Sequence, residues 1–296
     1  MDTLRIALFG SRFHSEKRCH VISLFDVFRK AGCSLFVCRN FYNFLTTVMT
    51  DPPVVDGLID GDDFDADFVV SVGGDGTYLR TAHRIGNKGI PILGVNTGRL
   101  GFLADTECVD LSVFLMDIGK GSYSIDELRL VQLRVDGQVF DKYPCALNEI
   151  AVLKGDNSSM INIHASVNGE YLNGYQADGL LISTPAGSTA YALSVGGPIL
   201  MPNSRDLLIA AVAPHNLAVR PIVVDDSSVI DLEIESRSHN FLVSLDGASF
   251  QLPCSAHLQV SLADFTIRSV KPLNHSFLQT LRQKLYWGMD PRHDPR

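Results

Sequence analysis

Apolar residues in the first hundred positions gather into short runs that are separated by helical patterns. The runs occupy residues 4–10, 34–38, 67–73 and 90–96. Strands that are apolar throughout are typical of a parallel sheet covered on both faces by helices. One helical pattern could begin with Ser15 as its cap and extends to Ala31, after which Gly32 is a stop signal. A second helical pattern spans residues 78–85. We therefore expect an α/β domain with a parallel sheet.

The pattern changes at about Tyr123, where strand-like runs follow one another closely. Asp136-Gly137 and Asn168-Gly169 each separate two such runs, and both dipeptides suit tight hairpin turns that need positive φ. Further strand-like runs occupy residues 221–224, 229–235, 240–247, 258–263 and 265–270. Residues 277–287 return to helical spacing. The later part of the chain is therefore predicted to be mostly antiparallel and β-rich.

Composition narrows the class of protein. The 296 residues favour two domains, and no run approaches the roughly 20 apolar residues of a transmembrane helix. An acid at position 2 followed by a strand-like run does not resemble a secretory signal, so we expect a cytoplasmic protein. A net charge of −8 without a basic block argues against a nucleic-acid partner. The six cysteines and nine histidines are scattered, which favours reduced thiols and gives no zinc-type spacing.

A glycine-rich segment with a single carboxylate follows the third run, where Gly73, Gly74 and Gly76 surround Asp75 and Thr77 comes next. Ligands of open α/β sheets bind at this end of the strands, and bare glycine amides at a helix start can bind phosphate. A carboxylate beside phosphates is electrostatically unfavourable, so its presence indicates a role. It could accept a proton from an attacking hydroxyl or help to hold Mg²⁺. An ordinary tight turn is the alternative. Neither GxxxxGK[ST] nor GxGxxG is present.

Two more segments carry polar residues where apolar ones are expected. The strand-like run 180–182 leads into a stretch rich in Ser, Thr and Gly, which could bind ribose and amide groups while Tyr191 offers its ring to a base. A serine-rich connection, with Asp178 as a turn residue, is the alternative. Asn148 and Glu149 lie inside an apolar run, so one of them is expected to face a core or cleft and to need a partner there. That partner is either a ligand or neighbouring backbone.

With these segments combined, the sequence resembles the NAD kinase family, enzymes that phosphorylate NAD to NADP. The matching segments are VVSVGGDGTYLRTA, IPILGVNTGRLGFLAD, LNEIAV, ADGLLISTPAGSTAYALSVGGPI, APHNLAVRPIVV and FLQTLRQKLYWG. Lipid kinases share GGDG, whereas the hydroxyl-rich segment is particular to NAD kinases. The resemblance implies an α/β nucleotide-binding domain of residues 1–104 with 272–296, a β-rich NAD-binding domain of residues 105–271, and NAD bound in the cleft between them.

The resemblance also implies roles for single residues. Asp75 is implied to accept the proton of the ribose hydroxyl, and Asn148 with Glu149 to bind the adenosine ribose. Gln176 stands where several relatives carry a basic residue, so the choice between NAD and NADH stays open. The remaining implied contacts with NAD or the phosphates are Gly73, Gly74, Gly76, Thr77, Arg80, Phe102, Asp178, Ala186, Thr189, Ala190, Tyr191 and Ser194.

The activity implied is transfer of the γ-phosphoryl group of ATP to the 2′-hydroxyl of the adenosine ribose of NAD, with Mg²⁺ or another divalent cation accompanying ATP and no metal-binding residues assigned. The family tends to form homodimers and homotetramers, and no membrane partner is expected. Two alternatives remain open at this point: a lipid kinase with the same GGDG segment, and a NADP-binding sensor that does not turn over.

Overall fold

The computed structural model describes residues 3–12, 18–98, 100–107, 111–155, 159–273 and 275–287. Ser15, the expected helix cap, lies outside these residues. The chain forms two compact units, one of Met1–Glu127 with Ile267–Arg296 and the other of Leu128–Thr266. Within the described ranges, no helix is long and apolar enough to cross a membrane.

The first unit is built on a parallel sheet with the strand order β3-β2-β1-β4-β5. Its strands are β1 (Arg5–Gly10), β2 (Ser34–Cys38), β3 (Gly57–Ile59), β4 (Phe68–Gly73) and β5 (Ile92–Asn96). β5 also pairs with β6 (Thr106–Glu107) and, through Ile92 and Ser269, with the end of β19 (Leu258–Pro272). The parallel sheet is confirmed, and four of its strands are those expected; β3 escaped prediction because it has only three residues.

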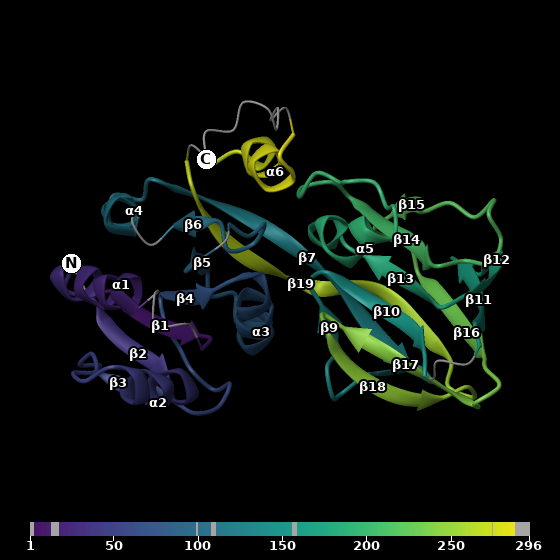
Figure 1. Cartoon of the computed structure of the whole chain (residues 1–296), viewed down its shortest axis with the longest axis horizontal. Coiled ribbons are helices and arrows are strands. Elements are labelled where there is room, and N and C mark those ends of the chain that lie inside the picture. Colours follow the sequence, from purple (N-terminus) through teal and green to yellow (C-terminus); the bar gives the residue numbers. More distant parts are fainter. Residues whose placement is uncertain are drawn as a thin grey trace. The chain divides into compact units, whose positions relative to one another are not determined.

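Helices cover both faces of this sheet (Figure 1). The helices of the first unit are α1 (Arg18–Lys30), α2 (Arg39–Val48), α3 (Asp75–Ile85), followed by the short 3₁₀ helix η2 (Gly86–Lys88), α4 (Leu111–Gly119) and α6 (Phe277–Leu285). On one face, Phe28 of α1 and Leu111 of α4 join a core with Leu8 and Val70. Ser71, the next residue of β4, points to the opposite face, where its hydroxyl lies 3.4 Å from that of Thr81 in α3.

Helices α2 and α4 were not predicted from the sequence. α2 is rich in aromatic and β-branched residues, which favour strands, but its helical period buries Phe41 and Leu45 on one side. α4 is apolar almost throughout, so its sequence has little periodicity. Leu111 and Leu115 pack into the core of the first unit. The first unit therefore extends to residue 127, whereas the expected division lay between residues 104 and 105.

The second unit contains two antiparallel layers. One layer has the strand order β15-β14-β13-β10-β17-β18, and the other joins β12, β11, β16 and β19, with β7 on β19 and β8 and β9 on β7. The strands are β7 (Tyr123–Val135), β8 (Gln138–Val139), β9 (Cys145–Ala146), β10 (Glu149–Lys154), β11 (Ile161–Val167), β12 (Glu170–Ala177), β13 (Gly179–Ser183), β14 (Asp206–Val212), β15 (Ile222–Asp225), β16 (Ile230–Glu235), β17 (Asn240–Leu245) and β18 (Ala248–Pro253).

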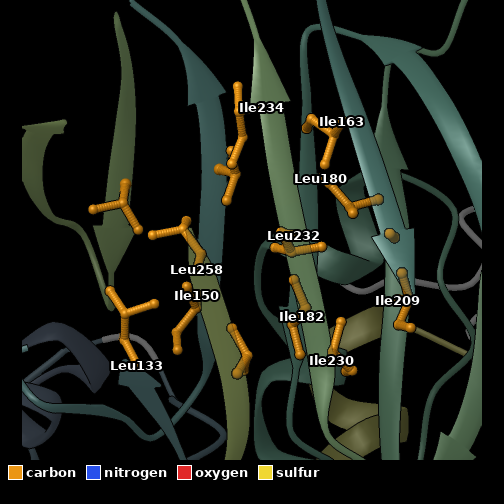
Figure 2. Packing of buried hydrophobic residues seen from close by; sticks show 14 of the residues in the cluster. Leu133, Ile150, Ile163, Leu180, Ile182, Ile209, Ile230, Leu232, Ile234 and Leu258 are labelled. Carbon is orange, nitrogen blue, oxygen red and sulfur yellow. The ribbon is translucent and has the colours of Figure 1, made fainter. Parts of the chain in front are cut away.

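Alternating apolar residues of the two layers meet in one core, as Figure 2 shows for Ile150, Ile182 and Ile209 from one layer and Leu232 and Leu258 from the other. The predicted hairpin turns are confirmed, with φ of 51° and 80° at Asp136-Gly137 and 53° and 79° at Asn168-Gly169. Residues 258–263 and 265–270, expected as separate runs, form the single long strand β19. The β-rich character of this unit is therefore as predicted.

Candidate functional site

The glycine-rich segment lies at the carboxyl end of β4 and leads directly into α3, which begins at Asp75. The side chain of Asp75 binds the loop that follows β5. Its Oδ2 accepts a hydrogen bond from the amide of Phe102 at 2.9 Å. Its Oδ1 accepts from the amides of Leu103 at 3.0 Å and Ala104 at 2.9 Å. The carboxylate thus fixes three successive amides, a structural role that the sequence did not indicate.

Glycine at position 101 makes this arrangement possible. A Cβ on Gly101 would lie 2.0 Å from Oδ1 of Asp75, closer than any real contact. The amide of Gly101 also donates to the carbonyl of Ala104 at 3.0 Å, which closes the loop on itself. Gly101 is therefore a residue on which the position of Asp75 depends.

Gly74 and Gly76 are exposed, and the packing of the protein itself does not require glycine at either position. No described atom lies within 4 Å of a Cβ built on Gly74. Outside the backbone of its own helix, the nearest atom to a Cβ on Gly76 is a guanidinium nitrogen of Arg80, at 3.7 Å. Gly73 differs, because a Cβ there would lie 2.5 Å from Oγ1 of Thr77. Bare backbone at Gly74 and Gly76 therefore favours close approach of a ligand over an ordinary turn.

Thr77 and Arg80 lie on the first turns of α3. Thr77 is buried, whereas Arg80 is exposed and donates from Nη2 to Oγ1 of Thr77 at 3.3 Å. Ser11, just after β1, lies beside the glycine-rich segment, because its amide donates to the carbonyl of Val72, the residue before Gly73, at 3.2 Å. Ser11 was not identified from the sequence, although its place after a predicted parallel strand was a usable signal.

Phe102 and Asp105 connect the loop to the last part of the chain. The Phe102 ring lies 6.4 Å from that of Phe277 in α6. Asp105 Oδ2 lies 2.5 Å from Nζ of Lys271 and 2.7 Å from Nε2 of His275, and the Asp105 side chain is 3% exposed. Burial opposes the charge of Asp105, yet Lys271 and His275 hold its pKa below the usual range. The loop that carries the Asp75 contacts is therefore anchored from two sides.

In the second unit, Asn148 and Glu149 are both buried, although the sequence led us to expect only one of them to be. β10 begins at Glu149, so Asn148 precedes the strand and need not alternate with it. Asn148 Oδ1 and Glu149 Oε2 have no hydrogen-bond donor among the described residues. Because buried polar atoms in native proteins are nearly always paired, these two acceptors are suited to receive donors from a ligand.

The carboxyl group of Glu149 has an unusual environment. Burial, and next the negative charge of Asp246, raise the pKa of Glu149 to about 7, while a hydrogen bond from the amide of Tyr191 works in the opposite direction. Near neutral pH the group therefore exists in both protonation states. Such a carboxyl group can accept a hydrogen bond and, when protonated, can also donate one.

The backbone of this pair is fixed by Asp246, which sequence reasoning missed. Asp246 Oδ2 accepts from the amide of Leu147 at 2.7 Å, and its Oδ1 accepts from Asn148 at 2.8 Å and Glu149 at 3.2 Å. On the other side, the carbonyl of Asn148 accepts from the amide of Thr184 at 2.9 Å. Burial raises the pKa of Asp246, and the three amide donors oppose that rise.

The hydroxyl-rich segment divides into two groups. Ser183, Thr184 and Ser188 are fully buried and bond within the protein; for example, Thr184 Oγ1 donates to the carbonyl of Leu147 at 2.6 Å. After them come a 3₁₀ turn, η4 (Ala186–Thr189), and a short helix, α5 (Tyr191–Ser194). The implied contact residues are all at least partly exposed: Ala186, Thr189, Ala190, Tyr191 and Ser194.

Gln176 lies on β12, and Asp178 directly follows that strand. Gln176 is exposed on β12, in one cross-strand row with Asn162 and Glu235, and lines a pocket with them. Asp178 Oδ1 forms an ion pair with Nζ of Lys154 at 2.8 Å. Neither has a described contact with the buried pair at the start of β10.

Metal ligands were not assigned from the sequence. Over the described part of the chain, no group of three or more His, Cys, Asp or Glu side chains could hold a metal ion. Mg²⁺ commonly keeps several waters and binds one or two carboxylates together with substrate phosphates.

Two family models match the chain: the ATP-NAD kinase N-terminal domain at residues 37–123 and the ATP-NAD kinase C-terminal domain at residues 147–271. The NAD kinase of Bacteroides fragilis is 48% identical over 289 residues, which cover 98% of this chain and 100% of that protein. The NAD kinase of Porphyromonas gingivalis is 44% identical over 284 residues, with coverages of 96% and 98%.

Two solved structures are similar to this one. An NAD kinase from Archaeoglobus fulgidus in complex with ATP has a TM-score of 0.74 and 25% identity, covering 96% of this chain and 99% of that chain. The yeast NADH kinase complexed with NADH has a TM-score of 0.87 at 20% identity, covering 99% and 90%, and supports the fold alone. On these matches and its two-unit architecture, the chain belongs to the ATP-NAD kinase family of phosphotransferases.

Proposed function

We propose that the protein transfers the γ-phosphoryl group of ATP to the 2′-hydroxyl of the adenosine ribose of NAD, producing NADP. The observation that carries this proposal is the pair of buried acceptors, Asn148 Oδ1 and Glu149 Oε2, which have no donor among the described residues. Ribose hydroxyl groups are donors of the kind these atoms require. Membership of the family argues against the lipid-kinase alternative.

The second unit would bind NAD. Asn148 and Glu149 hold the ribose hydroxyls, and the exposed ring of Tyr191 lies against a base. The amide of Tyr191 donates to Glu149, so the aromatic contact and the ribose-binding pair are physically linked. The remaining NAD contacts proposed in this unit are Gln176, Asp178, Ala186, Thr189, Ala190 and Ser194.

The first unit would bind the phosphates and supply the proton acceptor. Backbone amides for the phosphates come from the start of α3 and from Gly73, Gly74 and Gly76. Arg80 adds a positive charge at an exposed position. Thr77 orients Arg80 through its hydroxyl, and Phe102 lies beside the dinucleotide.

Asp75 would orient the attacking 2′-hydroxyl and accept its proton late in the transfer. Its carboxylate offers about four acceptor directions, of which three amides occupy three. One direction is left for a hydroxyl donor. The three amides also fix the carboxylate in place, which is a requirement for positioning in phosphoryl transfer.

Mg²⁺, or another divalent cation, is proposed to enter with ATP. The fit rests on the donor set, since the described carboxylates form no cage and phosphate oxygens are the usual additional ligands. Asp75 is the carboxylate of the glycine-rich segment that would lie nearest to such a cation. When bound, the cation neutralises charge on the phosphoryl oxygens.

The test is formation of NADP from NAD, ATP and Mg²⁺, detected with a dehydrogenase specific for NADP. Asp75→Asn is expected to lower turnover by about 10² to 10⁴, the usual range for a lost general base. A parallel reaction with NADH in place of NAD measures the preference between the two dinucleotides, which the presence of Gln176 left open. No NADP from a parent protein that still binds NAD would refute the kinase and favour the sensor.

We further propose that the enzyme works in the cytoplasm and associates into dimers or tetramers. The support for the location is chemical, because ATP and NAD must both be available. The second unit ends in edge strands β12, β15 and β18, which are able to pair with another copy. Cell fractionation and light scattering of the purified protein test the two statements separately.

A further inference from the structure

We propose that Asp246 is a positioning residue for NAD binding: its carboxylate fixes the backbone of residues 147–149 so that Asn148 and Glu149 present their acceptor atoms to the ribose. This inference rests on the proposed function, because it concerns the same nucleotide. It assigns to a hairpin turn a role that the sequence pattern did not reveal.

The geometry of the turn supports this role. Asp246 and Gly247 connect β17 to β18 with φ of 49° and 89°, the combination of a tight hairpin turn. A turn of this kind needs no particular contact from its first residue. Here, however, the Asp246 carboxylate reaches the strand beside it and accepts hydrogen bonds from three successive amides between 2.7 and 3.2 Å.

On the side that faces β17, these three amides precede the described strand pairing. β10 pairs with β17 only from Ile150 onward, which lies opposite Leu245. Residues 147–149 therefore lie just before the backbone pairing of β10 with β17. There the Asp246 carboxylate, and not a strand carbonyl, accepts their amide hydrogen bonds. Its own amide donates to the carbonyl of Glu149 at 3.2 Å, which binds the turn to the same residue a second time.

Asp246 also acts on Glu149 through charge. The groups that face Glu149 from the packed elements are Asp246 from the β17–β18 turn, Ser183 from β13 and the amide of Tyr191 from α5. Of these, Asp246 is the group whose negative charge raises the pKa of Glu149. Removing that charge should make Glu149 lose its proton at lower pH, so NAD affinity should change its pH dependence.

The experiment compares Asp246→Asn and Asp246→Gly with the parent. Asn and Gly both tolerate positive φ, so the turn is preserved. Asn replaces the carboxylate by a neutral amide that keeps one acceptor oxygen, and Gly removes the side chain. We expect the KM for NAD to rise about tenfold for Asn, the effect of one lost hydrogen bond, and further for Gly. The KM for ATP should change little. The midpoint in the pH dependence of NAD affinity should move to lower pH.

Asp136 provides a matched control. It begins an identical Asp-Gly turn with φ of 51°, and its Oδ1 accepts from the amide of His257 at 3.0 Å, away from the ribose-binding pair. Asp136→Asn and Asp136→Gly should leave both KM values and the pH dependence unchanged. If the Asp246 variants behave like these controls, or raise both KM values equally, or do not fold, Asp246 is not a positioning residue for NAD.

Equilibrium dialysis with NAD separates this inference from the proposed function. A parent protein that binds NAD but forms no NADP would refute the kinase, while weaker NAD binding by the Asp246 variants would still support the positioning role. A parent that forms NADP and variants with unchanged NAD affinity give the opposite result, in which the kinase stands and the positioning role is refuted.

Discussion

At the scale of single residues, the position of Asp75 depends on a glycine that carries no chemistry of its own. Gly101→Ala would place a Cβ 2.0 Å from Asp75 Oδ1, so the carboxylate must move while remaining present. Because a misplacement of about 1 Å can cost 10²-fold, we expect turnover to fall by about 10², with a smaller change in the KM for NAD. The measurement is steady-state NADP formation.

Gly119→Ala serves as the matched control, because a Cβ at Gly119 meets no described atom within 4 Å. Its activity should equal that of the parent. Normal turnover in Gly101→Ala would mean that the loop position of the carboxylate has no part in the reaction.

Glu149 should make the stability of the protein depend on pH. Its pKa is raised from 4.5 to about 7 in the folded state, so the folded protein holds a proton that the unfolded chain releases between these values. The contribution of Glu149 to the free energy of unfolding, on the order of 3 kcal/mol, is therefore fully present below about pH 4.5 and is lost as the pH rises through 7. Urea unfolding without nucleotide should show a smaller loss between pH 5 and pH 8 in Glu149→Gln. Parallel pH profiles for the two proteins would contradict the raised pKa.

Sequence reasoning found the residues whose chemistry is conspicuous in their local pattern. Asp75 stands among glycines, and Asn148 with Glu149 interrupts an apolar run. It missed Gly101, Asp105 and Asp246, because each acts through a contact that the local pattern does not encode. The hydrogen bonds of Asp246, for example, join residues 97 to 99 positions apart in the chain.

At the scale of elements, the loop after β5 depends on an ion pair with the end of β19. Lys271→Met would leave the buried charge of Asp105 with His275 alone, and loss of one partner of a buried pair typically costs about 3 to 5 kcal/mol. We expect the urea midpoint to fall clearly. Adding Asp105→Asn to the same variant should recover part of the loss, because the unpaired charge is then removed.

Arg39→Met is the control for that experiment, since Arg39 pairs with Asp60 at the exposed surface and should contribute little. Equal effects of the Lys271 and Arg39 variants would show that the buried pair does not stabilise the loop.

The elements themselves were predictable where their periodicity was clean. The apolar parallel strands and the Asp-Gly and Asn-Gly hairpins have strong local signals, and the structure contains them. α2 and α4 were missed because aromatic residues in one and continuous apolar character in the other hide the helical period. The single long strand β19 was expected as two runs because polar Asp264 lies between them.

At the scale of the whole molecule, each unit contributes a carboxylate that holds three successive amides. Asp75 does so in the first unit, beside the glycine-rich segment, and Asp246 does so in the second, beside the buried acceptors. Each device fixes backbone next to residues assigned to the reaction. The general arrangement of an α/β unit and a β-rich unit followed from the sequence, whereas these devices required the structure.

The most direct test of the central claim is a label-transfer measurement. The protein is incubated with NAD, Mg²⁺ and ATP labelled in its γ-phosphoryl group, and the product is analysed by chromatography and phosphorus NMR. We predict that the label appears as a 2′-phosphomonoester on the adenosine ribose, giving NADP. Label found only in inorganic phosphate, or no consumption of ATP by a protein that binds NAD, would contradict the assignment of this chain as an NAD kinase.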